Sequence, residues 1–183
     1  MLKPVLIVDI DQTLIDSTIR ENFCYNNDML DLLTYRALTP TMACKDSLLP
    51  LGEYLEANIH TMVLDFKIIL LTARVNCEHS HKSLAKLMPN ILINMDNFIH
   101  RGNIHLFAWL GGKYKGLELV QCSGAYKAPI IDYYAMLGHK AIVIDDCPKV
   151  LNCSKNIYRA ICARDLWHYN TDDFDKLFNS LAY

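Results

Sequence analysis

Four aspartates follow two apolar stretches of the sequence, two after each stretch. Asp9 and Asp11 come after the first, and Asp145 and Asp146 come directly after the second. Four carboxylates in one place repel one another unless a cation lies among them. Hard oxygen ligands that leave coordination positions open for water and phosphate are typical of Mg²⁺. The pattern therefore predicts a magnesium site where the two stretches end together.

Three other residues have side chains suited to a phosphate at such a site. Thr72 follows a third apolar stretch and can donate a hydrogen bond to a phosphoryl oxygen. Lys127 can supply a fixed positive charge, and Arg74 can either contact a substrate or form a surface ion pair. Other lysines compete with Lys127 for the same role, namely Lys113, Lys115 and Lys140.

Apolar runs that alternate with helical patterns predict the elements that position these residues. Strands are expected at 5–8, 68–71, 91–93 with 98–99, 117–120, 141–144 and 157–162. Helices are expected at 49–64, 79–87, 128–137 and 172–181. This alternation favours an α/β domain with a mainly parallel sheet. Ligands bind beyond the carboxyl ends of the strands in such sheets, which is where Asp9, Thr72 and Asp145 fall.

The composition is that of one globular domain covering residues 1–183. Apolar residues make up 52% and charged residues 21%, which argues against disorder. The formal net charge of −2 argues against a broadly basic nucleic-acid binder. The charge is unevenly distributed, however: residues 1–66 carry 4 basic and 10 acidic side chains, and residues 67–127 carry 8 basic and 3 acidic. Residues 15–47 are polar-rich and irregular, and they can form a small flap over one end of the sheet.

Cysteine usage and targeting signals favour a cytoplasmic protein. The seven cysteines are odd in number and scattered, and no CxxC occurs, so a disulfide framework or structural zinc site is poorly supported. No signal peptide or membrane-spanning stretch is recognised, so no membrane is expected as a partner. Cys77, His79 and His81 have no fourth ligand beside them and are interpreted as surface residues.

Taken in order, the polar residues resemble the four motifs of the haloacid dehalogenase (HAD) superfamily of phosphohydrolases. The motifs fall at residues 9–13 (DxDx[TV]), at Thr72, at Lys127, and at the pair Asp145 and Asp146. The resemblance extends from residue 5 to about residue 148. One departure is Gln12, where many members have glycine. The resemblance implies a Rossmann-like three-layer sandwich with a minimal cap or none.

The resemblance also implies the role of each catalytic residue. Asp9 would be the nucleophile that attacks phosphorus and forms an aspartyl-phosphate. Asp11 would protonate the leaving oxygen and then activate water for the second step. Thr72 and Lys127 would hold the phosphoryl oxygens and offset charge in the transition state.

The metal ligands implied by the resemblance come from the first and fourth motifs. Mg²⁺ would contact the Asp9 carboxylate, the backbone carbonyl of Asp11, and Asp146. Asp145 would lie beside the metal or orient its waters. The cation is needed because an anionic nucleophile must otherwise attack an anionic phosphate.

The substrate is indicated by residues 98–127, where basic and aromatic side chains are interleaved. The basic ones are His100, Arg101, His105, Lys113 and Lys115, and the aromatic ones are Phe107, Trp109, Tyr114 and Tyr126. Basic groups can bind phosphates while rings stack on bases. The alternative is that the rings belong to the core and the lysines to a solvated loop.

This arrangement is similar to the phosphatase domain of phage polynucleotide kinase-phosphatases, which have little cap and an arginine after a middle strand, here Arg101. The substrate contacts expected from the sequence are Thr72, Ala73, Arg74, Arg101 and Lys127. The first hypothesis is a Mg²⁺-dependent phosphatase acting on a nucleotide or a polynucleotide 3′-phosphate. A HAD phosphatase for another small metabolite and a non-catalytic HAD-fold binding protein are the alternatives, and the oligomeric state stays open.

Overall fold

A parallel five-stranded sheet forms the centre of the computed structural model, which describes residues 2–26, 29–30, 34, 41–74, 78–100 and 123–182. The strands lie in the order β7-β6-β1-β8-β9. Their bounds are β1 (Val5–Val8), β6 (Lys67–Leu71), β7 (Asn97–Ile99), β8 (Ala141–Asp145) and β9 (Ile157–Cys162). β1 pairs in parallel with both β6 and β8, and Val8 lies opposite Leu70 on one side and Ile144 on the other. The carboxyl ends of these three strands therefore meet at one edge.

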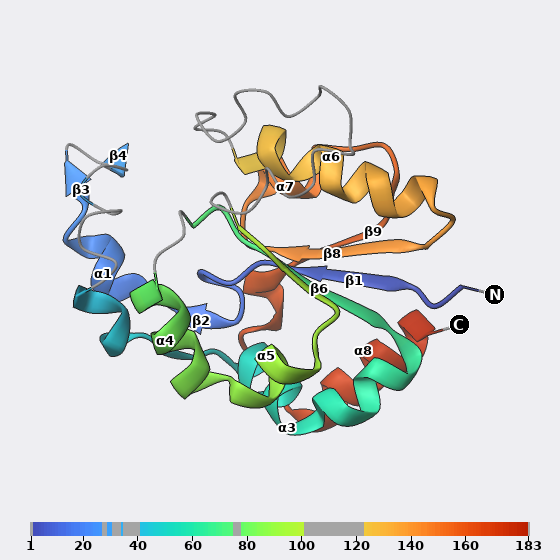
Figure 1. Ribbon diagram of the computed structural model, residues 1–183, viewed down its shortest axis with the longest axis horizontal. Helices are drawn as coiled ribbons and strands as arrows, with labels where there is room; N and C mark the ends of the chain where they lie inside the picture. The colour runs from blue at the N-terminus through green and yellow to red at the C-terminus, as the bar shows by residue number, and fades with distance from the viewer. Residues whose placement is uncertain are drawn as a thin grey trace.

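Helices cover both faces of this sheet (Figure 1). One face is covered by α3 (Pro50–Asp65), α4 (Glu78–Leu87), α5 (Pro89–Asn94) and α8 (Thr171–Ala182), and the other by α6 (Ser123–Met136) and α7 (Pro148–Leu151). Alternate residues of β1 belong to two separate cores: Leu6 and Val8 pack on the α3 side, and Val5 and Ile7 on the α6 side. Burial on both faces explains why this strand is an unbroken apolar run.

Short elements connect β1 to α3. β2 (Ile15–Asp16) pairs with β5 (Ser47–Leu48) in antiparallel fashion, and α1 (Thr18–Asn22) and the 3₁₀ helix η1 (Ala43–Lys45) lie between them in the chain. β3 (Tyr25–Asn26) and β4 (Met29–Leu30) form a second two-stranded ladder. A further 3₁₀ helix, η4 (Ala163–Leu166), follows β9. The segment expected to be irregular thus contains regular but very short elements.

The structure confirms most of the elements expected from the sequence, and it corrects one. The strand predicted at 91–93 is wrong, because these residues lie in helix α5. Pro89 occupies the first turn of that helix, where its missing N–H is not needed, and Ile91 is buried in the core. A short apolar run does not distinguish a strand from a buried helical turn. The strand predicted at 117–120 lies outside the described residues.

The α/β architecture is accordingly that of a Rossmann-like sheet flanked by helices. None of the helices in the described ranges has the length and apolar character needed to cross a membrane.

Gly52 lies where helix α3 packs directly on the loop that follows β1. A Cβ atom placed on Gly52 would lie 2.2 Å from the carbonyl oxygen of Leu14, which also accepts a 2.9 Å hydrogen bond from the Leu49 N–H. Gly52→Ala is expected to lower the free energy of unfolding by about 2–3 kcal/mol, because backbone rather than a flexible side chain must move. Urea denaturation measures the change. His60→Ala, on an exposed position of the same helix, should stay within about 0.5 kcal/mol; equal effects would contradict the close contact.

Candidate functional site

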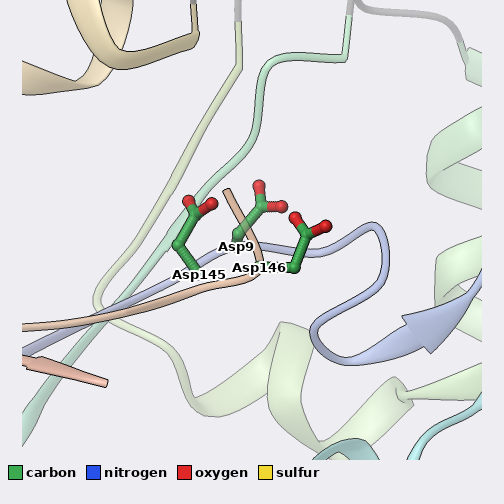
Figure 2. Close-up of side chains that lie close together, drawn as sticks. All are labelled: Asp9, Asp145 and Asp146. Carbon is green, nitrogen blue, oxygen red and sulfur yellow. The ribbon is translucent and has the colours of Figure 1, made fainter. Parts of the chain in front are cut away.

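Three aspartates meet where β1 and β8 end. β6, the next strand of this sheet along the chain, lies on one side of β1, and β8 lies on the other. The gap between β1 and β8 is therefore the topological switch point at which such sheets bind ligands. Asp9 follows β1, Asp145 ends β8, and Asp146 comes next. One carboxylate oxygen of each lies within 4.8 Å of the others, and Figure 2 shows the three side chains side by side. This cluster can hold a metal ion.

Lys127 of helix α6 lies between two of these aspartates. Its Nζ donates hydrogen bonds of 2.6 Å to Asp9 Oδ1 and of 2.6 Å to Asp145 Oδ2. Burial alone would lower the pKa of Lys127, but the two carboxylates raise it well above its usual value, so the ammonium stays charged. Of the competing lysines, Lys140 precedes β8 at the far end of that strand, and Lys113 and Lys115 lie outside the described residues.

The environment of Asp9 favours a bound cation. Burial raises the pKa of the Asp9 carboxyl, the Lys127 ammonium lowers it, and the neighbouring Asp145 and Asp11 raise it again, to a final value of about 8. The carboxylate form is therefore costly without further positive charge beside it. A cation placed among the aspartates would supply that charge.

The aspartates differ in how far their oxygens are already used. Both oxygens of Asp145 accept hydrogen bonds, Oδ2 from Lys127 and Oδ1 from the Cys147 N–H at 2.9 Å. Asp146 Oδ2 accepts a 3.2 Å bond from Arg164, whose side chain is 61% exposed. Asp9 and Asp146 are thus the better placed ligands, with Asp145 oriented beside them.

A second charged cluster surrounds Asp11. Arg74 binds its carboxylate with two donors, Nε to Oδ2 at 2.7 Å and Nη2 to Oδ1 at 2.6 Å. Arg20 adds a third contact, from Nη2 to Oδ1 at 2.6 Å. Burial would raise the pKa of Asp11, but the two guanidinium groups hold it well below its usual range. Asp11 is therefore a carboxylate in this structure.

Arg20 and Asp46 belong to the charged cluster around Asp11, although no sequence pattern predicts their part in it. Both side chains are buried, and Arg20 Nη2 donates to Asp46 Oδ2 at 2.9 Å. They come from the segment expected to be irregular and polar, where charged residues are normally solvated, so neither has a local sequence signal. The sequence signal that points to Arg20 is its positive charge within an otherwise acidic stretch.

The residues after β6 show how Thr72 and Arg74 are held. Thr72 is buried; its N–H donates to the Ile99 carbonyl at 2.9 Å, and its Oγ1 accepts from the Arg74 N–H at 3.2 Å. The hydroxyl proton of Thr72 can still be donated. Ala73 lies half-buried between them. The prediction that Arg74 forms a surface ion pair is wrong, because its side chain is buried against Asp11.

The other candidate residues from the sequence are either placed away from the role considered for them or lie outside the described part of the chain. Tyr126 is completely buried in the core, so it is not available to stack on a base, and the core alternative holds for this residue. His100 is half-buried at the end of β7 beside Phe98. Outside the described residues or side chains fall Arg101, His105, Phe107, Trp109, Lys113, Tyr114, Lys115, Cys77, His79 and His81.

Gln12 occupies a tight turn, at the position where many members of the superfamily that the sequence resembles have glycine. Its φ of 56° is in the left-handed region, which costs a non-glycine residue about 1 kcal/mol. Its Nε2 donates to Ser17 Oγ and to Thr18 Oγ1, each at 3.2 Å, so the side chain fastens the loop to α1. The departure from glycine is therefore compatible with the turn.

Among the described residues, the site has more carboxylates than cations. Its carboxylates are Asp9, Asp11, Asp46, Asp145 and Asp146, and its buried cations are Arg20, Arg74 and Lys127. With all five carboxyl groups ionised, these described residues carry two more negative than positive charges before the exposed Arg164 is counted, which a divalent cation would offset. The donor set of hard carboxylate oxygens fits such an ion.

Asp146→Asn is expected to weaken binding of a divalent cation. At a Mg²⁺ concentration about 100 times the Kd, binding should stabilise the wild-type fold by about 2.7 kcal/mol, and the variant should lose most of that gain. Differential scanning fluorimetry with increasing Mg²⁺, against an EDTA reference, measures the shift in Tm. Asp65→Asn, which removes an exposed carboxylate at the end of α3, should respond like the wild type. A full response from Asp146→Asn would exclude this residue as a ligand.

No family model matches the sequence, and no curated protein matches it either. What the site does is therefore inferred from its own geometry and chemistry.

Proposed function

We propose that the protein is a Mg²⁺-dependent phosphomonoester hydrolase of the HAD type that works through an aspartyl-phosphate intermediate. The observation that carries this proposal is the convergence of a buried aspartate, a lysine and a second aspartate pair at the switch point of a parallel sheet. Asp9 lies at its centre, with Lys127 on one oxygen. Together with Thr72, these residues resemble the four HAD motifs in sequence.

The first step transfers the phosphoryl group to Asp9. A carboxylate oxygen of Asp9 forms a bond to phosphorus while the bond from phosphorus to the leaving oxygen breaks. The negative charge of a bound phosphoryl group would offset the two guanidinium groups that hold Asp11 as a carboxylate. Asp11 then takes up a proton from solvent and gives it to that leaving oxygen. The product of this step is an alcohol together with an acyl phosphate on Asp9.

The second step regenerates the enzyme. Asp11, again a carboxylate, takes a proton from a water molecule, whose oxygen attacks phosphorus and breaks the bond to Asp9. Inorganic phosphate leaves, and Asp9 returns to its carboxylate form. The carboxylate state of Asp11 that Arg20 and Arg74 favour suits this step directly.

The charges needed around phosphorus come from both clusters. Thr72 can donate its hydroxyl proton to a phosphoryl oxygen, and the Lys127 ammonium is fixed beside the nucleophile. Mg²⁺ held by Asp9, the Asp11 backbone carbonyl and Asp146 would offset the negative charge of the phosphoryl group and the carboxylates.

The proposed substrate is a nucleotide or a polynucleotide 3′-phosphate. The excess of basic side chains in residues 67–127 supports an anionic substrate, and Lys127 and Arg74 come from this segment. Burial of Tyr126 removes one of the rings considered for stacking. A small phosphorylated metabolite is the competing substrate, to be separated by assay.

The test is a hydrolysis assay with the purified protein in Mg²⁺ and in EDTA. The panel contains p-nitrophenyl phosphate, deoxynucleoside monophosphates, oligonucleotides with a 3′-phosphate, and sugar phosphates. We expect release of inorganic phosphate that needs Mg²⁺, with the highest kcat/KM on the nucleotide or oligonucleotide substrates. A higher kcat/KM on sugar phosphates would favour the hypothesis of a small phosphorylated metabolite as substrate. A protein inert on every phosphate would overturn the proposed function and favour a binding role.

A further inference from the structure

Asp46 belongs to none of the four motifs, yet its side chain is almost completely buried beside the site. It follows η1 and precedes β5, and only 1% of the side chain is exposed. Its carboxylate accepts hydrogen bonds from Arg20 Nη2 at 2.9 Å, from Arg20 Nε at 3.5 Å and from Arg74 Nη2 at 3.3 Å. A buried carboxylate with this many charged partners has a role in holding them.

Each of the two arginines bridges Asp46 to Asp11. The Nη2 atom of Arg20 lies 2.6 Å from Asp11 Oδ1 and 2.9 Å from Asp46 Oδ2. The Nη2 atom of Arg74 lies 2.6 Å from Asp11 Oδ1 and 3.3 Å from Asp46 Oδ2. The Asp11 carboxylate is thus bound by two guanidinium groups that Asp46 binds as well.

The charges explain why a second carboxylate is needed. Two buried guanidinium groups that converge on one carboxylate would leave a net positive charge and repel each other. Asp46 offsets this excess, so that within the described part of the chain two cations face two anions. It is also tied to the loop that carries Asp11, because β5 directly after it pairs with β2 directly after that loop.

We infer that Asp46 is a positioning residue for Asp11, acting through Arg20 and Arg74. It fixes the two guanidinium groups, and these fix the carboxylate that exchanges protons with the leaving oxygen and with water. The inference rests on the proposed phosphatase function. It assigns to Asp46 a part in proton transfer rather than in metal binding or in the attack of Asp9 on phosphorus.

Two substrates with different leaving groups test this assignment. A p-nitrophenolate leaves with little help from a proton, whereas an alkoxide needs one. The experiment compares kcat/KM of wild type and Asp46→Asn on p-nitrophenyl phosphate and on the alkyl phosphate that the wild type hydrolyses best. The value of kcat/KM reports the steps up to and including phosphoryl transfer. We expect a loss of about 10- to 100-fold on the alkyl phosphate and less than about threefold on the aryl phosphate.

Arg20→Lys is the second variant, and it keeps the inference falsifiable if Asp46→Asn does not fold, because Asp46 is inferred to act through Arg20. It keeps the positive charge, but a single ammonium does not reproduce the planar fork that spans both carboxylates. The same selective loss on the alkyl phosphate is expected. Asp132→Asn is the matched control, because the Asp132 carboxylate accepts hydrogen bonds from Ser154 and Asn156. Its replacement should leave the ratio of kcat/KM on the alkyl phosphate to kcat/KM on the aryl phosphate unchanged.

The outcomes separate the two proposals. Selective loss on the alkyl phosphate in folded Asp46→Asn supports the inference. Equal losses on both substrates, or none, overturn it and leave the phosphatase proposal standing. A wild-type protein inert on both substrates overturns the proposed function and the inference together.

Discussion

Asp9→Asn is expected to reduce hydrolysis of p-nitrophenyl phosphate by at least about 10³-fold, because an amide oxygen is a very weak nucleophile. The side chain is 9% exposed, and asparagine has nearly the same shape and still offers an oxygen to Lys127 Nζ. The fold should therefore be retained while the bond to phosphorus no longer forms. Single-turnover assays in saturating Mg²⁺ measure the loss directly, without a contribution from product release.

The control for this variant is an exposed carboxylate. Asp172→Asn, in the first turn of α8, removes the same charge far from the site in sequence and should keep wild-type activity. Circular dichroism of both variants checks that the fold is intact. Activity of folded Asp9→Asn within about tenfold of wild type would show that another group attacks phosphorus.

Lys127→Met is expected to lower the free energy of unfolding by about 3–5 kcal/mol in the absence of divalent cations. The substitution keeps much of the side-chain volume but leaves Asp9 and Asp145 facing each other without the ammonium that bonds to both at 2.6 Å. Urea denaturation in EDTA measures this change. Activity should also fall by at least about 10²-fold, because the fixed charge beside the phosphoryl group is lost.

Addition of Mg²⁺ separates the charge effect from lost packing in this variant. If the missing charge causes the instability, Mg²⁺ should stabilise Lys127→Met by more than it stabilises the wild type. Lys86→Met, at an exposed position of α4, should be within about 0.5 kcal/mol of the wild type in both conditions. A Lys127→Met protein as stable as the wild type in EDTA would contradict the bridging role of this lysine.

The strands that carry the candidate site were readable from the sequence for a physical reason. Strands buried on both faces, such as β1 and β8, are continuous apolar runs, so the first charged residue after each run marks its carboxyl end. The short run at 91–93 has the same apolar character, but there the proline before it and packing against α3 favour a helix. Local composition thus determined where strands end more reliably than which short runs are strands.

The surroundings of Asp11 show what local patterns do not reveal. Asp11 lies within the first motif and Arg74 lies two residues after Thr72, but their pairing joins residues 63 positions apart. Arg20 and Asp46 lie on short elements with no periodicity of their own, and they are buried only because the chain folds back through the β2–β5 pair. Charged residues in such segments are usually solvated, so their burial is a property of the tertiary fold.

The sequence by itself determined the chemical identity of the candidate metal cluster and the α/β class of the domain. Both depend on residue type and on spacing within single elements, namely an apolar run followed at once by acids. Only the tertiary structure decided that β1 lies beside β8, which brings Asp9 to Asp145 and Asp146, and that two buried arginines hold Asp11. Strand order and buried ion pairs result from contacts between distant segments, whose free energies depend on the whole packed core rather than on neighbouring residues.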